Sequence, residues 1–246
     1  MEALKHRLSL EDKEADLKKE AAVLYDELIR IPEVSEALTI LDNLPEHLRY
    51  HNKAHTLDVI SETILFALAD GASRETIKQQ AIAAAWHDTG FIEQDKENEP
   101  IAAKLFKHSE AYQKLPEEER QEIIAEILDT AVVIRDGKPF LLQQRSKIGY
   151  VLDGDVSNFG RLDFSEKRTK VAEELNLDLS NDEIRKGFYA FSLELLKNYE
   201  WKTESARLLR QPQKEENLRQ AEKEYAEIVS AQSDKMRGAA QYKIGV

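Results

Sequence analysis

Apolar residues recur at helical spacing along almost the whole chain, whereas runs that alternate apolar and polar residues are nearly absent. In the stretch 54–69, for example, Leu57, Ile60, Ile64 and Leu68 fall on one face of a helix. Residues that break helices are scarce, because the 246 residues include only nine Gly and six Pro. The pattern therefore predicts an all-α fold.

Local signals place the boundaries of the predicted helices. Pro32 interrupts the first apolar face, and Ser73 is a good N-cap. Gly90 is expected to terminate the helix that carries Trp86-His87-Asp88 at its end. We expect helices at about 11–30, 34–41, 54–69, 73–88, 100–108, 117–128, 148–159, and through most of the chain from 163 onward.

One segment departs from the helical pattern. The residues AVVI at 131–134, followed by a turn-like Asp-Gly pair, form the only strand candidate in an irregular connection at about 130–145. No fixed-period repeat and no long flexible linker marks a second domain. We therefore predict a single domain over 1–246, with a core at about 20–200 and a C-terminal helical extension at about 201–246.

Composition excludes several kinds of site. The chain has no Cys, so it has no disulfide, no Cys-ligated zinc and no thiol nucleophile. Its formal net charge of −12 argues against general nucleic-acid binding, which needs a basic surface, but leaves room for a small anion held by a local cation. No apolar run suits a signal peptide or a membrane helix, so we expect a cytoplasmic protein without a membrane partner.

Three motifs carry side chains that bind metals. His51 and His55 lie in YHNKAH, and His87 and Asp88 are adjacent in AAAWHDTGF. If a helix already includes residue 51, the first two imidazoles share a face; if it starts later, His51 lies at the mouth of the helix. Neighbouring residues point about 100° apart on a helix, so the His-Asp pair can reach one ion only near a helix end.

The third motif is VLDGDVSNFGR, which contains Asp153 and Asp155. Imidazoles together with carboxylates suit a divalent ion such as Mn, Fe, Co, Ni, Zn or Mg. Each motif alone has a simpler explanation, since a histidine at a helix end is usually satisfied by backbone or water, and Asp-Gly-Asp can form a turn. We apply that simpler explanation to His6, His47 and His108.

The order of the three motifs resembles the HD-domain superfamily of metal-dependent phosphohydrolases, whose signature is a His, a His-Asp pair and a distant Asp on a helical core. YHNKAHTLDV looks like the opening motif of cyclic-nucleotide phosphodiesterases and of related bacterial HD proteins. HDTGF, LDGDVSNFGR and TESARLLRQPQKEENL also look like segments of those bacterial proteins, so the resemblance covers about 20–225. It implies an HD-domain helical bundle with extra N- and C-terminal helices.

The resemblance also implies roles for single residues. Four side chains would ligate one firmly bound divalent ion: His55, His87, Asp88 and Asp155. Asp155 is preferred to Asp153 because the family usually writes this motif as Asp-Ala-Asp with the second acid as ligand. Asp88 would take part in catalysis and bridge to a second ion, and His51 would be a general acid for the leaving oxygen. A water activated by the metal would be the nucleophile.

Some positions depart from the family pattern or stay open. Where many relatives have His-Glu, this chain has Asn98-Glu99, which puts a second ion held fully by protein ligands in doubt. Asp58 is either a partner that fixes an imidazole tautomer or a solvated charge. Four basic residues lie nearest the motifs in sequence and are interpreted mainly as solvated surface cations: Lys53, Arg145, Lys147 and Arg161.

The resulting functional hypothesis is hydrolysis of a phosphate ester bond in a small, nucleotide-like substrate by a metal-activated water. One alternative is a non-catalytic HD-fold protein that binds a ligand or acts as a scaffold. A further alternative is a di-iron HD oxygenase, although such enzymes need more His ligands than this chain offers. The identity of the substrate, the native metal and the oligomeric state stay open at the level of the sequence.

Overall fold

The computed structural model describes residues 2–94 and 97–244, and the side chains of residues 15–94 and 97–231. The described chain is 71% helix, with eleven α-helices and one small hairpin. The elements in chain order are α1 (Glu2–Leu28), α2 (Pro32–Leu41), α3 (Lys53–Ala69), α4 (Arg74–Trp86), the 3-10 helix η1 (Thr89–Ile92), α5 (Asn98–His108), α6 (Glu110–Lys114), α7 (Glu117–Asp129), β1 (Val132–Arg135), β2 (Lys138–Leu141), α8 (Tyr150–Asp155), the 3-10 helix η2 (Ser157–Gly160), α9 (Phe164–Glu174), α10 (Asp182–Asn198) and α11 (Glu204–Ile244).

Capping residues start several of these helices. The Ser73 Oγ accepts a hydrogen bond from the Thr76 N–H at 3.1 Å, which confirms the predicted N-cap of α4. The Asn52 side chain accepts from two N–H groups of the first turn of α3, so the helix begins just after it. Pro32 is the first residue of α2, where its missing N–H costs no hydrogen bond.

The mostly helical chain confirms the all-α prediction, with one small hairpin as the exception within the described residues. Strand β1 pairs antiparallel with β2, within the segment predicted to be irregular, and β1 contains most of the strand candidate at 131–134. Asp136 and Gly137 join the strands with φ of 50° and 75°, the left-handed backbone of a tight hairpin turn. Asp-Gly suits this turn because glycine and aspartate tolerate that backbone well.

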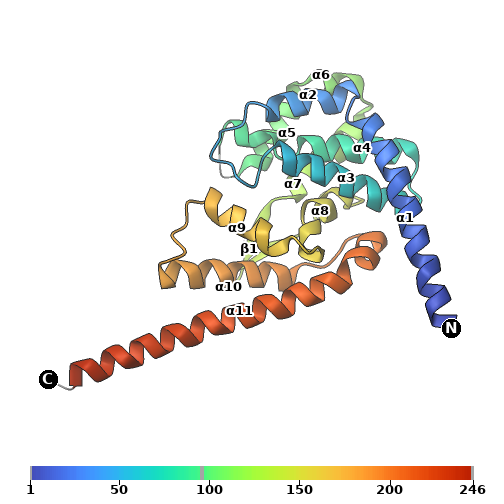
Figure 1. The fold of residues 1–246 in the computed structure, drawn as a ribbon. Coiled ribbons are helices and arrows are strands. Elements are labelled where there is room, and N and C mark those ends of the chain that lie inside the picture. The colour runs from blue at the N-terminus through green and yellow to red at the C-terminus, as the bar shows by residue number, and fades with distance from the viewer. Residues whose placement is uncertain (1, 95–96, 245–246) are drawn as a thin grey trace.

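Helix α3 runs through the centre of the main hydrophobic core and packs between α1, α4 and α8 (Figure 1). Its residues Ile60, Ile64 and Phe66 are fully buried, as is Trp86 at the end of α4. A second, smaller core joins α8 to α10 and the first half of α11 around Leu152, Leu196 and Tyr199. The beginning of α3, the end of α4 and the end of α8 therefore meet where the two cores adjoin.

Two predicted boundaries are wrong for identifiable reasons. Gly90 does not end α4: the helix already stops at Trp86, and Gly90 lies inside η1, where a Cβ would overlap the Asn98 carbonyl oxygen of α5. The helix predicted at 148–159 is divided into α8 and η2 at Val156, whose φ of −100° and ψ of 18° leave the helical range. Gly90 is thus required by its close packing against α5, and not by the end of a helix.

The carboxylates of α7 hold the loop that leads into α8. Asp129 accepts from the backbone N–H groups of Gln144, Arg145 and Ser146, and Glu126 accepts from that of Gly149 at 2.9 Å. Burial raises the pKa of Glu126 to about 8. This loop has little regular structure of its own, so these bonds fix the point at which α8 starts.

The terminal helices extend from the body of the molecule in Figure 1. Helix α1 begins at Glu2, earlier than predicted, and α11 begins at Glu204 and continues to Ile244. The first half of α11 packs against the rest of the molecule, where Arg210 makes a bidentate ion pair with Glu62 of α3 at 2.7–2.9 Å. No helix within the described residues is long and apolar enough to cross a membrane.

Candidate metal centre

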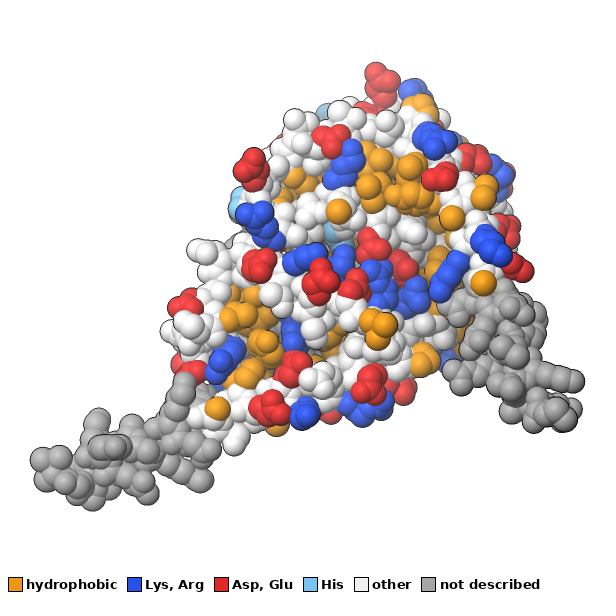
Figure 2. Space-filling model, viewed as in Figure 1, with side chains coloured by type: hydrophobic (Ala, Val, Ile, Leu, Met, Phe, Trp, Pro, Cys, Tyr) orange, Lys and Arg blue, Asp and Glu red, His pale blue; other side chains and the backbone are white. Residues whose placement is uncertain are grey.

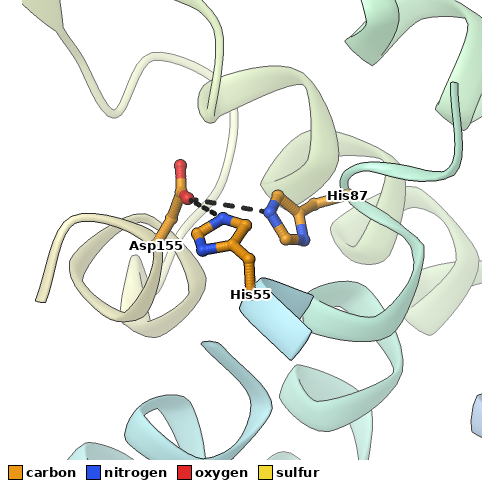
Figure 3. A group of neighbouring side chains, drawn as sticks. All are labelled: His55, His87 and Asp155. Atoms are coloured by element: carbon orange, nitrogen blue, oxygen red, sulfur yellow. Dashed lines mark hydrogen bonds and ion pairs between the residues drawn. The ribbon is translucent and has the colours of Figure 1, made fainter. Parts of the chain in front are cut away.

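His55, His87 and Asp155 come together from three helices that are far apart in sequence (Figure 3). His55 lies in the first turn of α3, His87 directly follows α4, and Asp155 ends α8. The Asp155 Oδ1 lies 3.0 Å from His55 Nε2 and 3.7 Å from His87 Nε2, and the ligand atoms all lie within 4.8 Å of one another. Such a group of side chains could hold a metal ion.

Asp88 adds a fourth ligand-type side chain to this cluster. Its Oδ2 lies 3.1 Å from His87 Nε2 and 3.4 Å from His55 Nε2. Helix α4 ends at Trp86, just before this pair, so the side chains of His87 and Asp88 are not held 100° apart by a continuing helix and both face the cluster. A shared ion needs this arrangement, as expected from the sequence. His87 Nε2 and Asp88 Oδ2 are both buried and neither makes a hydrogen bond in the structure. Buried polar atoms that make no hydrogen bond are rare, and a cation bound within the cluster would satisfy both.

The orientation of His87 also fits a metal ligand. Its Nδ1–H donates to the Ala84 carbonyl oxygen at 2.7 Å, which leaves the Nε2 lone pair directed into the cluster when the ring is neutral. Burial lowers the pKa of His87, but the charges of Asp88 and Asp155 outweigh it and raise that pKa well above its ordinary value. A proton and a metal ion therefore compete for the same nitrogen.

The two acids of the last motif face in different directions. Asp153 is fully buried and accepts hydrogen bonds from Tyr199 Oη at 2.5 Å, from Lys202 N at 2.9 Å, and from both the N–H and the hydroxyl of Thr203 at 2.8 and 2.7 Å. It thereby ties α8 to the connection between α10 and α11. Asp155 is the acid that faces the histidines, in agreement with the preference drawn from the sequence.

His51 lies just before α3, at the mouth of the helix, and beside the cluster. Its Nδ1 is 2.5 Å from Glu174 Oε1, while Glu174 Oε2 accepts from the backbone N–H groups of Tyr50 and His51 at 2.8 and 2.9 Å. The imidazole stacks on Phe91 with ring centroids 4.6 Å apart. Burial lowers the pKa of His51, and the hydrogen bond to Glu174 together with nearby carboxylates raises it, with a net increase.

Glu174 has no counterpart among the residues selected from the sequence. It ends α9, 123 residues after its partner His51, and this charged helix contains two other glutamates, Glu166 and Glu173. Only the three-dimensional contact distinguishes it from them.

Asp58 is half-buried and pairs with basic side chains rather than with an imidazole. Its carboxylate pairs with Arg161 Nη1 at 2.9 Å and with Lys167 Nζ at 3.3 Å. These ion pairs, assisted by hydrogen bonds, lower the pKa of Asp58 despite its burial. Of the two alternatives left open for Asp58, the one in which it fixes an imidazole tautomer is therefore not the arrangement found.

The other basic residues nearest the motifs also have acidic partners away from the cluster. Lys53 pairs with Asp42 at 2.7 Å, and Lys147 pairs with Glu118 at 3.4 Å. Arg145, in the loop that leads into α8, pairs with Asp129 at 3.2 Å.

The remaining histidines stay outside the cluster where they are described. His108 Nδ1 donates to the Lys104 carbonyl oxygen at 2.8 Å, the backbone role that the sequence suggested. His47 lies at an exposed position, and the side chain of His6 lies outside the described residues.

A cavity of about 800 Å³ adjoins the cluster. His51, Asp88 and Asp155 line it at one end, together with Glu99 of α5. Burial and the nearby carboxylates Asp88 and Asp155 raise the pKa of Glu99. Glu99 of the Asn98-Glu99 pair therefore lies in the cavity, close to the candidate metal ligands.

Comparisons with protein-family models, with curated proteins and with solved structures found no match to this chain.

Proposed function

We propose that the protein is a metal-dependent phosphohydrolase of the HD type, with His55, His87, Asp88 and Asp155 as the ligands of a divalent cation. The observation that carries the proposal is a cluster of two imidazoles and two carboxylates in which two buried atoms, His87 Nε2 and Asp88 Oδ2, make no hydrogen bond. The order of these residues in the sequence, which resembles that of HD-domain phosphohydrolases, supports the same assignment.

The donor set suits Mn, Fe, Co, Ni, Zn or Mg. When bound, such a cation lowers the pKa of water and offsets negative charge on phosphoryl oxygens. Within this arrangement the Asp88 Oδ2 lies inside the cluster and makes no hydrogen bond, and Glu99 offers a further carboxylate in the adjoining cavity. These two acids are the described groups best placed to share a second ion.

His51 is the proposed general acid. Glu174 holds its Nδ1, and Phe91 fixes the plane of the ring, so the imidazole keeps one orientation at the edge of the cavity. A histidine in this setting donates a proton to the oxygen of the leaving group, which a phosphate ester requires as its P–O bond breaks. Its partner Glu174 favours the protonated form that this role needs.

The test combines metal content with turnover. Purified wild-type protein loaded with Mn or Ni is expected to hold the metal and to hydrolyse bis-p-nitrophenyl phosphate or a member of a nucleotide panel. His87→Ala is expected to lose both, because it removes a buried ligand, whereas His108→Ala, which changes an exposed histidine outside the cluster, retains both. The proposal is wrong if wild type turns over none of these esters and His87→Ala changes neither metal content nor activity.

Two other functions predict different outcomes. A non-catalytic binding protein would hold metal and ligand without any turnover. A di-iron oxygenase would show an iron-dependent absorption band after aerobic loading with two irons per chain. The described residues bring only two histidines into the cluster, which favours hydrolysis over this oxygenase chemistry.

A further inference from the structure

The cavity beside the candidate metal centre has two chemically different parts. Its polar end contains the carboxylates and His51 described above. Most of its remaining wall comes from α9, α10 and the hairpin and is apolar. Residues that represent this apolar wall are Phe164, Val171, Ile184, Phe188, Phe191 and Leu195. The volume of about 800 Å³ lies within the range of roughly 300–1,000 Å³ that is typical of small-molecule sites.

The polar atoms within this wall are mostly committed to other partners. Arg168 bonds to Glu224 at 2.5 Å, and its guanidinium lies 4.3 Å from the centroid of the Tyr189 ring. The Ser192 hydroxyl donates to the Phe188 carbonyl oxygen at 2.9 Å. A nucleobase or a sugar needs several donors and acceptors at fixed positions, because its own polar groups would otherwise be buried without partners. The part of the wall formed by α9 and α10 does not provide them; the amides of Asn98 and Asn158, whose buried Oδ1 atoms make no hydrogen bond, line the cavity from α5 and η2.

The apolar wall also reaches the surface. Among the lining residues, Leu175, Ile184 and Phe191 are 55%, 39% and 43% exposed. Figure 2 shows hydrophobic atoms at the surface in the region of α9 and α10. Single exposed apolar side chains are ordinary, but these three border one cavity that leads to a cluster of charged ligands. An apolar group can thus enter from solvent and reach the centre in one continuous space.

We infer that the substrate is an amphiphilic phosphate ester, with its phosphoryl group at the metal centre and an alkyl, prenyl or aryl group in the apolar part of the cavity. The inference rests on the proposed function and narrows the nucleotide-like substrate expected from the sequence. Each methylene that leaves water contributes about 0.8 kcal/mol, which corresponds to about a fourfold gain in affinity. Affinity therefore rises steeply with the length of the apolar group.

The test is calorimetric titration of ethyl-, hexyl- and decylphosphonate, which keep a phosphoryl group but resist hydrolysis. Manganese-loaded wild-type protein is expected to bind them in that order of increasing affinity, by up to about fourfold for each added methylene. The same order is expected for His87→Ala, at weaker overall affinity, because the apolar wall is unchanged. Equal affinity for the three phosphonates would overturn the inference.

A variant that fills the cavity gives a second readout. Gly187 lines the cavity from α10, and a Cβ at this position meets no atom within 4 Å. Replacing a glycine inside a helix also removes a conformational penalty, so the variants should fold, and circular dichroism verifies this. Gly187→Phe is expected to reduce the preference for decyl- over ethylphosphonate at least tenfold, whereas Gly187→Ala, the control that also removes the glycine but adds only a methyl group, keeps most of that preference. An unchanged preference in Gly187→Phe would contradict the inference.

Two further outcomes separate this inference from its alternatives. If a second copy of the chain covers the apolar wall, light scattering will show a wild-type dimer that Gly187→Phe dissociates, and chain length will not affect binding, which overturns the inference. Turnover of phosphate esters without any dependence on chain length also overturns it while leaving the proposed hydrolase intact. Binding that depends on chain length without turnover of any ester supports the apolar site and contradicts the hydrolase.

Discussion

At the scale of single residues, the bond between Glu174 and His51 is the contact with the clearest consequence for reactivity. One carboxylate oxygen bonds to the imidazole, and the other binds the backbone N–H groups of residues 50 and 51. Glu174 therefore fixes both the position of His51 and its protonation. It acts through His51, so it is a positioning residue.

We predict that Glu174→Gln lowers kcat by about tenfold to a hundredfold, the usual effect of losing a partner that orients a functional histidine. The hydrogen bond that the His51 Nδ1–H donates to Glu174 raises the pKa of His51, so the loss of this bond lowers that pKa. A general acid works only below its own pKa, and the alkaline limb of the pH–kcat profile should therefore move to lower pH. Steady-state kinetics across pH measures both effects.

The matched control is Glu166→Gln, which changes an exposed glutamate on the same helix that pairs with Lys170. It should leave the profile where it is. If Glu174→Gln reduced kcat equally at every pH without moving the alkaline limb, Glu174 would have only a structural role.

At this scale, the sequence identified the site residues that lie in short motifs, but not the residues of distant helices that contact them. His55, His87 and Asp155 could be selected because short motifs surround them, and the structure does bring them together. Glu174 and Lys167 could not be selected, and Arg161 was named without its partner Asp58, since these contacts join residues more than 100 positions apart. Local patterns contain no information about which charged side chain of a distant helix will complete an ion pair.

At the scale of elements, the short helix α8 depends on close packing against α3. Gly154 lies between the two acids of α8, and a Cβ at this position would overlap the Thr63 Oγ1. Any side chain here must push α8 away from α3, and Asp155, the next residue, would move with it. The distance between Asp155 and His55, 3.0 Å in the structure, is therefore set by a glycine.

We predict that Gly154→Ala lowers the free energy of unfolding by about 1–3 kcal/mol, the usual cost of overpacking a core. It should also weaken Mn binding, because Asp155 is displaced from the histidines. Urea denaturation and calorimetric titration with Mn measure the two quantities. Adding Thr63→Ala removes the overlapping atom and should restore much of the metal affinity.

Gly187→Ala, which places a methyl group in open space on α10, is the control for the change from glycine to alanine. A Gly154→Ala variant that bound Mn as tightly as wild type would show that α8 can shift without disturbing the site.

Elements were predictable where spacing and caps act locally. The bounds predicted for α3 and α7 lie within one residue of the observed ones, and Ser73 caps α4 as predicted. The errors arise where tertiary packing decides. Gly90 was interpreted as a helix terminator, but its contact with α5 requires the glycine. The break at Val156 has no signal in a sequence that continues with good helical spacing.

At the scale of the whole molecule, the candidate centre joins segments of both hydrophobic cores. His55 lies in α3 and His87 directly follows α4, and both helices belong to the first core. Helix α8, which carries Asp155, contributes Leu152 to the second core. A cation bound there would connect the two cores, and its binding energy would add to the stability of the folded chain, since the unfolded chain has no such site.

We predict that a metal present at about 100 times its Kd raises the free energy of unfolding by about 2.7 kcal/mol. For a chain of this size that corresponds to a rise in Tm of about 5–10 °C. Scanning calorimetry with EDTA and then with excess Mn or Zn measures it. His87→Ala should show no such rise, and His108→Ala should match wild type. An equal rise in His87→Ala would place the metal elsewhere on the molecule.

The separation of the ligands along the chain has a consequence for the order of events during synthesis. Asp155 follows His55 by 100 residues, so a ribosome releases both histidines and Asp88 long before the last ligand appears. Until then a nascent chain offers only a partial, exposed set of donors with little means of discriminating among ions. The complete geometry, and with it any selectivity for one metal, arises only when α8 has docked, which makes ion choice a property of the finished fold.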